Sequence, residues 1–142
     1  MTFAIGKDKS AIRHAPFPLK AVHSKKAPPA IGPYSQAMVV KNLVFVSGMI
    51  ALDPATGKMV DGGVKEQTER VLANLRAVLK AAGTSKKNVA KTTVFLKDAS
   101  LFKEMNEIYA KFFGNHKPAR ATLVTGFPRE DILIEIDSIA TR

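Results

Sequence analysis

The spacing of apolar residues changes near residue 64 of this 142-residue chain, and that change limits the folds open to it. From there to Gly83 the apolar residues recur at helical spacing, which predicts an amphipathic helix. A second helix is predicted between Ser100, a suitable N-cap, and Gly114. The apolar faces of these two helices are Val71, Leu72, Leu75, Val78, Leu79 and Ala82, and Leu101, Met105, Ile108, Tyr109 and Phe112.

The other apolar segments are short and separated by turn residues, as is typical of strands. The predicted strands are 20–24, 37–40, 43–47, 91–96, 121–126 and 132–140. Three strands, a helix, a strand, a helix and two strands therefore follow one another. This order predicts an α+β fold, with a single mixed β-sheet and two helices packed on one of its faces.

Such a layout leaves the second face of the sheet without a covering layer. We take five aliphatic residues as candidates for that face, namely Val39, Val44, Val46, Val94 and Ile134. A chain of this length has no third layer to cover them. We therefore expect a homo-oligomer whose subunits pack sheet face against sheet face.

The chain has the length of one domain, which we place at residues 20–142, after a basic N-terminal extension at residues 1–19. Residues 1–30 hold six Lys or Arg and one Asp, within a formal net charge of +10. The extension has three readings: an organelle-targeting peptide, a phosphate-binding arm, or a loosely packed surface segment. A cytoplasmic and a mitochondrial location both fit this composition.

Composition and motifs exclude several kinds of chemistry. The absence of cysteine excludes disulfides, thiolate metal sites and a cysteine nucleophile. His14, His23 and His116 do not have the spacing of a zinc site, so no metal is expected. No apolar run is long enough to span a membrane. The chain also lacks a Gly-rich phosphate loop and a nucleophile-elbow motif.

Arg120 and Glu135 are the charged residues most difficult to explain by local structure alone. Arg120 begins a β-prone run, and Glu135 interrupts the aliphatic segment 132–136. A guanidinium grips a carboxylate or phosphate in bidentate fashion, whereas a half-buried carboxylate is costly unless it is paired or acts on a ligand. The two residues either form a site that holds an anionic substrate and positions a water, or simply pair across antiparallel strands.

Four further positions are candidates for a site. Gly48 follows Ser47 at the end of a predicted strand, where a glycine permits either a bulge or a close approach to a ligand. Tyr34 follows a rigid proline-rich turn that fixes it near the surface. Asn106 lies at the border of the second helix's apolar face, where it reaches a site or solvent. Phe102 is more typical of a core than of a ligand pocket.

Five segments, in order and covering residues 20–140, resemble the RidA (reactive intermediate deaminase) family of the Rid superfamily. They are the run Ala30-Ile31-Gly32-Pro33-Tyr34-Ser35-Gln36-Ala37, the tripeptide Val46-Ser47-Gly48, the helix that starts at Glu66-Gln67-Thr68 and ends at Ala81-Ala82-Gly83, the strand Lys91-Thr92-Thr93-Val94-Phe95-Leu96, and Lys117-Pro118-Ala119-Arg120 through Ile134-Glu135-Ile136.

The resemblance implies a chorismate-mutase-like α+β fold and a homotrimer with its sites between subunits. It also implies hydrolysis of reactive 2-imino acids, such as 2-iminobutanoate and 2-iminopropanoate, to 2-keto acids and ammonia, without metal or cofactor. It assigns binding of the substrate carboxylate to Arg120 and positioning of the water to Glu135. The pocket positions that it implies are Tyr34, Ser47, Gly48, Phe102, Asn106 and Thr122.

Two positions depart from the family pattern. Met49 replaces a common glutamine, and Phe127 lies in an altered turn, so both are expected to affect the pocket and its substrate preference. Two other functions remain open. One is an RNA-directed endoribonuclease or translation inhibitor, since a charge of +10 favours at least non-specific RNA binding. The other is a non-catalytic small-ligand sensor.

Overall fold

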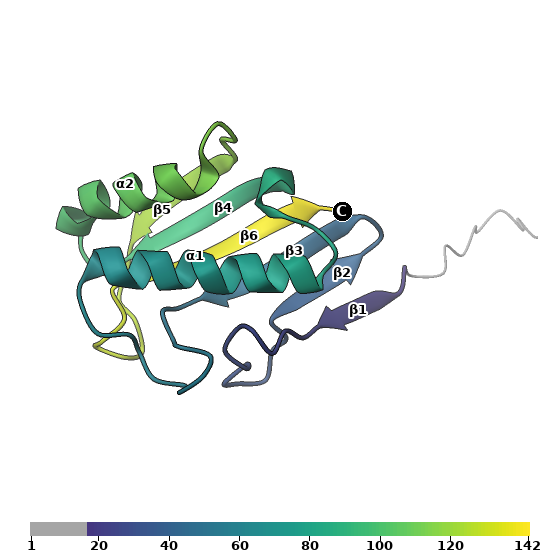
Figure 1. Cartoon of the computed structure of the whole chain (residues 1–142), viewed down its shortest axis with the longest axis horizontal. Coiled ribbons are helices and arrows are strands. Elements are labelled where there is room, and N and C mark those ends of the chain that lie inside the picture. The colour runs from purple at the N-terminus through teal and green to yellow at the C-terminus, as the bar shows by residue number, and fades with distance from the viewer. Residues whose placement is uncertain (1–16) are drawn as a thin grey trace, which may run out of the picture.

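The computed structural model describes residues 17–142, in which two helices cover one β-sheet (Figure 1). The strands are β1 (Leu19–Val22), β2 (Ala37–Val40), β3 (Leu43–Met49), β4 (Val89–Leu96), β5 (Ala119–Val124) and β6 (Ile134–Thr141). The helices are α1 (Val64–Ala81) and α2 (Phe102–Phe113), and the short 3-10 turns η1 (Lys86–Asn88) and η2 (Ala99–Leu101) precede β4 and α2. The predicted α+β fold is confirmed. The extension at 1–19 lies almost wholly outside the described residues.

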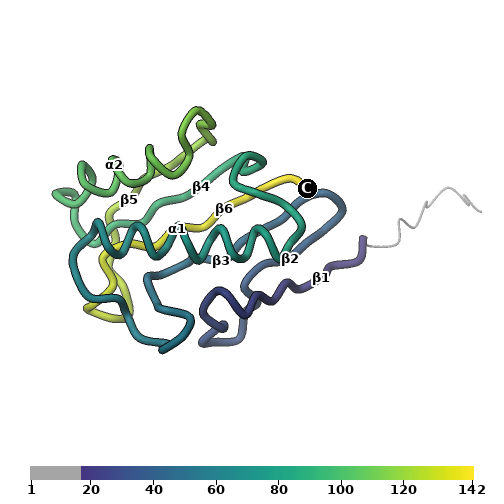
Figure 2. The backbone as a smooth tube through the Cα atoms, in the orientation of Figure 1, coloured from purple at the N-terminus to yellow at the C-terminus, as the bar shows by residue number. Residues whose placement is uncertain are grey.

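The strand order in the sheet is β1-β2-β3-β6-β4-β5, which places the last strand of the chain in the interior (Figure 2). β6 pairs antiparallel with both β3 and β4. β5 pairs with β4 in parallel, and α2 makes the crossover that a parallel pair requires. As a result, β5 and β6 are consecutive in the chain but have β4 between them.

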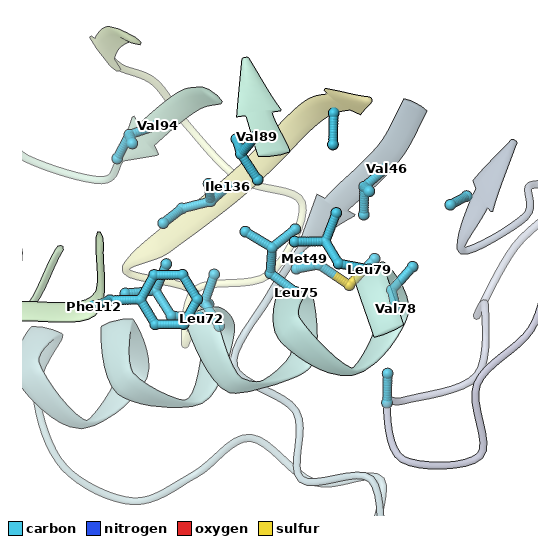
Figure 3. Close-up of a cluster of buried hydrophobic side chains, with 14 of the residues drawn as sticks. Val46, Met49, Leu72, Leu75, Val78, Leu79, Val89, Val94, Phe112 and Ile136 are labelled. Atoms are coloured by element: carbon cyan, nitrogen blue, oxygen red, sulfur yellow. The ribbon is translucent and has the colours of Figure 1, made fainter. Parts of the chain in front are cut away.

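Both helices lie on the same face of the sheet (Figure 1). Figure 3 shows Leu72, Leu75 and Leu79 of α1 among the strand residues Val46 and Ile136, and all five belong to one buried cluster. Burial of this apolar stripe against the sheet is what stabilises an amphipathic helix of this kind. Within residues 17–142 no helix is long and apolar enough to cross a membrane.

The start of α2 differs from the prediction. Asp98, not Ser100, supplies the capping side chain, and its carboxylate accepts a hydrogen bond from the Ser100 N–H at 2.8 Å. This bond starts η2, and α2 follows without a side-chain cap at its own N-cap residue, Leu101. The prediction of Ser100 as the cap is wrong because an Asx turn begins two residues earlier.

The five residues predicted for the uncovered face of the sheet lie on the other face. Val39, Val44, Val46, Val94 and Ile134 are all buried, and they lie in the core under the helices. Side chains of a strand alternate between the two faces, so an error of one position exchanges the faces completely. Phe45, next to Val44 in the chain, is 42% exposed and points to the opposite side.

The face without helices is nevertheless apolar, as expected. The strand alternation and register place on it Met38, Val40, Leu43, Phe45, Phe95, Leu123 and Ile139. We call this surface the open face. Its large exposed side chains, including Leu123 at 46%, form an apolar surface of the kind that commonly mediates association between chains. The expected need for a covering partner therefore stays a prediction, now resting on a different set of residues.

A charge introduced at two adjacent positions of β3 should have opposite consequences. Val44→Asp buries an unpaired carboxylate in the core and should cost about 3–5 kcal/mol of folding free energy. Phe45→Asp places the same carboxylate on the open face and should leave the far-UV circular dichroism native while weakening self-association. Circular dichroism and light scattering after size exclusion would test both variants. Equal loss of secondary structure in the two variants would contradict this assignment of faces.

Candidate functional site

A β-bulge in β3 lies next to the predicted site residues. β3 pairs with β6 up to Val46, opposite Ser138, and resumes at Met49, opposite Ile136. Two residues of β3, Ser47 and Gly48, therefore lie opposite a single residue of β6. A bulge of this kind bends the strand and redirects its side chains.

The bulge brings the Gly48 backbone against the side chain of Glu135. A methyl group at position 48 would lie 2.6 Å from the carboxyl carbon of Glu135 and would overlap one of its oxygens. Only a glycine leaves the room that the carboxylate occupies. The glycine is therefore required by a close approach within the chain, which the sequence analysis had considered as a close approach to a ligand.

Glu135 is half-buried, and its carboxylate has no compensating partner among residues 17–142. Burial is the main cause that raises the pKa of Glu135 above its usual value, and the neighbouring negative charge of Asp137 raises it further. The salt bridges in this part of the chain join Lys65 to Glu104 and Arg129 to Asp131, and neither involves Glu135. An unpaired carboxylate with a raised proton affinity has the properties of a general base.

Glu135 opens into a cleft of about 400 Å³, which we call the Glu135 cleft. Tyr34 forms part of its wall, with a hydroxyl oxygen that accepts a hydrogen bond from the Ile31 N–H at 3.3 Å. The full lining is Ile31, Tyr34, Ser47, Gly48, Ile50, Pro128, Arg129, Ile132 and Glu135. The walls of the cleft are thus mostly apolar, and Glu135 is the only carboxylate among the residues that line it.

A buried glutamine fixes the loop that carries Tyr34. The side-chain amide of Gln36 donates to the carbonyls of Ser24 at 3.2 Å and Pro28 at 2.7 Å. The Ser47 hydroxyl donates to the Ser35 carbonyl at 2.6 Å, so the bulge and the loop are joined. Gln36 was not predicted to shape the site. Its position directly before the apolar strand β2 was the available sign that its amide is buried and therefore hydrogen-bonded.

A second buried glutamine fixes the opposite wall. Gln67 of α1 donates to the Asp131 carbonyl at 2.7 Å and accepts from the Leu133 N–H at 2.9 Å. These bonds hold the segment from Pro128 to Ile132 against the helix. Gln67 lies among the apolar positions of α1, and this location was the available sign that it makes specific hydrogen bonds.

Arg120 lies elsewhere, on the helix-covered side of the edge strand β5. Its Nη1 donates to Asn106 Oδ1 at 2.8 Å. Its guanidinium carbon is 4.7 Å from the centre of the Tyr109 ring and 5.7 Å from that of Phe102. We call these three α2 residues the Arg120 seat. Thr122 lies two residues further along β5, on the same side of the strand.

Arg120 and Glu135 therefore do not meet within one chain. β4 separates their strands, and the register puts Arg120 opposite the buried Thr92 but Glu135 opposite Phe95, so the two side chains lie on opposite faces of the sheet. The alternative that they pair across antiparallel strands is wrong, because β5 and β6 are not neighbours. The structure gives two half-sites, the Glu135 cleft with Tyr34 and the bulge, and the Arg120 seat.

The two positions that depart from the family pattern do not line the Glu135 cleft. The Met49 side chain is buried among core residues near α1 (Figure 3). Phe127 lines a separate surface hollow with Lys97 and Val124, and only its neighbour Pro128 reaches the cleft. The effect of Met49 on the pocket stays a prediction, since its side chain points into the core, as that of Val46 does on the other side of the bulge. No cluster of three or more potential metal-ligating side chains occurs in residues 17–142.

The sequence of the chain matches a known family over most of its length. The model of the endoribonuclease L-PSP family matches residues 24–142. A RutC family protein of Pyrococcus abyssi is 48% identical over 121 residues, which cover 85% of this chain and 95% of that protein. The human 2-iminobutanoate/2-iminopropanoate deaminase is 43% identical over 121 residues, or 85% of this chain and 88% of the human protein.

A similar structure has been solved with a small ligand. The crystal structure of E. coli TdcF with bound serine superposes with a TM-score of 0.82 at 36% sequence identity, and covers 87% of this chain and 98% of that one. The family model covers residues 24–142, so the two half-sites lie inside the region that it matches.

Substitution of Gly48 should abolish any reaction that uses the Glu135 carboxylate as a base, while the chain still folds. In Gly48→Ala the new methyl group displaces the Glu135 carboxylate, and we expect turnover to fall about 100-fold or more, as when a general base is lost. Gly126→Ala is the matched control, because a methyl group there meets no atom within 4 Å. Activity and thermal unfolding would be measured on both. Wild-type turnover in Gly48→Ala would show that the position of this carboxylate is unimportant.

The unpaired Glu135 carboxylate should reduce stability as pH rises. A carboxyl whose pKa is raised in the folded state contributes most below the ordinary glutamate pKa of about 4.3, and that contribution is lost as pH rises through the folded-state pKa. Glu135→Gln should therefore raise the unfolding temperature by roughly 1–3 °C at pH 7.5 and by nothing near pH 4.

The experiment is best made in an Arg120→Ala background, because the family resemblance assigns this cation to the same site as Glu135. Glu130→Gln is the control, since Glu130 is exposed. Calorimetry at several pH values measures the difference. An increase at pH 4 equal to that at pH 7.5 would contradict the assigned direction of the Glu135 pKa.

Proposed function

The chain belongs to the endoribonuclease L-PSP family, the family of the Rid proteins, and we propose that it is an imine deaminase. Its proposed substrates are small reactive 2-imino acids such as 2-iminobutanoate and 2-iminopropanoate, and its products are 2-keto acids and ammonia. The observation that carries the proposal is the unpaired, half-buried Glu135 carboxylate held against Gly48 in a mostly apolar cleft.

The reaction requires little more than orientation and one base. The imine carbon is already electrophilic, so a water held about 3–3.5 Å away can attack once a carboxylate accepts its proton. The new C–O bond forms as the C=N π electrons move to nitrogen. Glu135 accepts the water proton and returns it to that nitrogen, which gives a neutral carbinolamine. The carboxylate then accepts the proton of the carbinolamine hydroxyl as the C=O bond forms, and passes it to the nitrogen as the C–N bond breaks. The products are ammonia and a 2-keto acid.

Arg120 is the proposed anchor for the substrate carboxylate. A guanidinium presents parallel N–H donors that match both oxygens of a carboxylate. The TdcF structure contains serine, which carries a carboxylate and a nitrogen on the adjacent carbon, as a 2-imino acid does, and this supports a site for a ligand of that size. Tyr34, Ser47 and the remaining pocket residues are proposed to enclose the substrate.

We further propose that the site forms between subunits of a homotrimer. Arg120 and Glu135 lie on opposite faces of their own sheet, so one substrate can touch both only if they come from different chains. The apolar open face supports association, and the exposed Phe45 and Leu123 side chains would become covered by it.

RNA cleavage or translation inhibition is a second candidate function. The matching family carries the description of an endoribonuclease, and the net charge of +10 favours attraction of RNA. The Glu135 cleft gives this candidate less support, because its walls are mostly apolar and Arg129, its cationic member, is held by Asp131.

The deaminase proposal is tested by competition with semicarbazide. A threonine dehydratase would generate 2-iminobutanoate, semicarbazide would trap it, and the release of 2-ketobutanoate would be followed. The wild type should outcompete the trap, whereas Arg120→Ala and Glu135→Ala should behave as buffer, with losses of about 100-fold or more. If the wild type itself does not outcompete the trap, the proposal fails and RNA cleavage becomes the leading candidate.

A mixture of the two inactive variants tests where the site lies. In trimers assembled at random from equal amounts of both chains, about one quarter of the sites would combine an intact Arg120 with an intact Glu135. Co-expression of the variants should thus restore about a quarter of the wild-type rate. No restoration, in mixed trimers shown to contain both chains, would mean that each chain builds its site alone.

A further inference from the structure

The Arg120 seat is built on one stripe of α2. Phe102, Asn106 and Tyr109 are four and three residues apart, a spacing that places them on the same side of a helix. The guanidinium of Arg120 lies over this stripe, with its hydrogen bond to Asn106 and its stacking distance of 4.7 Å to Tyr109. Tyr109 therefore makes the shorter of the two aromatic contacts of Arg120, although its spacing in the sequence indicated only a core position.

Tyr109 is itself held firmly. Its hydroxyl shares a hydrogen bond of 2.7 Å with Thr92 Oγ1, and its ring lies 4.7 Å from that of Phe113. Thr92 is also the residue of β4 that lies opposite Arg120 in the parallel register. Arg120, Thr92 and Tyr109 therefore form a closed set of contacts between β5, β4 and α2. Burial raises the pKa of Tyr109, outweighing its hydrogen bond and the charge of Arg120, so the phenol stays neutral.

The seat holds Arg120 through neutral groups. An amide oxygen and aromatic rings contact the guanidinium, and neither salt bridge within residues 17–142 involves Arg120. Its positive charge is therefore not cancelled by a fixed carboxylate. Nη1 is engaged by Asn106, while no described residue hydrogen-bonds to Nε or Nη2, the pair of donors that grips a carboxylate in bidentate fashion.

We propose that Tyr109 is a positioning residue for substrate binding. Its ring supports the guanidinium plane of Arg120 while Asn106 fixes the rotation of that plane, so that the Nε–Nη2 edge faces the substrate carboxylate. The inference rests on the proposed deaminase function and extends it to a residue of the core. A ring under the guanidinium orients the cation without removing its charge, which a carboxylate in the same place would do.

Three variants test the proposal. Tyr109→Leu removes the ring, Tyr109→Phe keeps the ring and removes only the hydroxyl, and Phe112→Leu is the matched control. Phe112 is also a buried aromatic residue of α2, and its ring also lies under a guanidinium, that of Arg76 at 4.9 Å. Arg76 has no part in the proposed site. Thermal unfolding of all three would show that each variant is folded at the assay temperature.

We expect Tyr109→Leu to raise KM for 2-iminobutanoate about tenfold and to leave kcat within about twofold, because the carboxylate is held poorly while the water attack is unchanged. Tyr109→Phe should restore a KM near that of the wild type. Phe112→Leu should show no such split between KM and kcat. Equal KM values for folded Tyr109→Leu and Phe112→Leu would overturn the proposal.

A binding measurement separates this inference from the proposed function. Titration with 2-ketobutanoate, the stable product, would be followed by NMR at the Nε–H of Arg120, and Tyr109→Leu should weaken binding about tenfold and change the ring-current shift of that proton. If the wild type binds 2-ketobutanoate through Arg120 but does not hydrolyse the imine, the deaminase proposal fails and the role of Tyr109 is decided by this affinity. If Tyr109→Leu leaves the affinity and the shift unchanged, or the wild type does not bind, the role assigned to Tyr109 is wrong.

Discussion

The half-buried carboxylate of Glu135, left without a partner in its own chain, is the feature around which the cleft is arranged. Transfer of a charge out of water is unfavourable unless neighbouring groups compensate, and here the described residues raise its proton affinity instead. The bulge at Ser47 and Gly48 makes the room for it, and buried Gln36 and Gln67 fix the two walls by bonding only to backbone. These glutamines are uncharged, so they stiffen the cleft without neutralising the Glu135 carboxylate.

The topology keeps the two charges of the proposed site apart. An arginine beside a glutamate in one chain would form an ion pair, which would lower the glutamate pKa and occupy the guanidinium. β4 lies between the strands of Arg120 and Glu135, and their side chains point to opposite faces. In the proposed site, each charge would therefore be available for a ligand until another chain brings its complement. The last strand, β6, lies in the interior of the sheet with β4 between it and β5. This strand order therefore affects the charges as well as the packing, because it prevents an ion pair between Arg120 and Glu135.

The sequence was sufficient for the order of elements, because the change from strand to helix spacing is a local property. It singled out Arg120 and Glu135 as site candidates because charges within apolar strands are conspicuous, and their roles stay predictions. It failed on which face of the sheet each strand residue occupies, because Val44 was assigned to the face that Phe45 occupies. Two adjacent apolar residues fit either face, and only the packing of the helices determines which of them is buried. Tyr109 was assigned only to the core, because the pattern that predicts burial contains no information about which cation lies over a buried ring.

In the proposed trimer, association and catalysis would depend on the same surface features. An apolar open face is unfavourable in water, and an unpaired carboxylate is unfavourable in a half-buried cleft, yet both lie on strands β3 and β6 of one sheet. In the proposed trimer, the association that covers Phe45 would also bring the edge strand β5 of one chain, with its Arg120, towards Glu135 of another chain. The hydrophobic effect would then supply the free energy that concentrates two complementary charges around a substrate, and a dissociated chain would keep its fold but hold only half of a site.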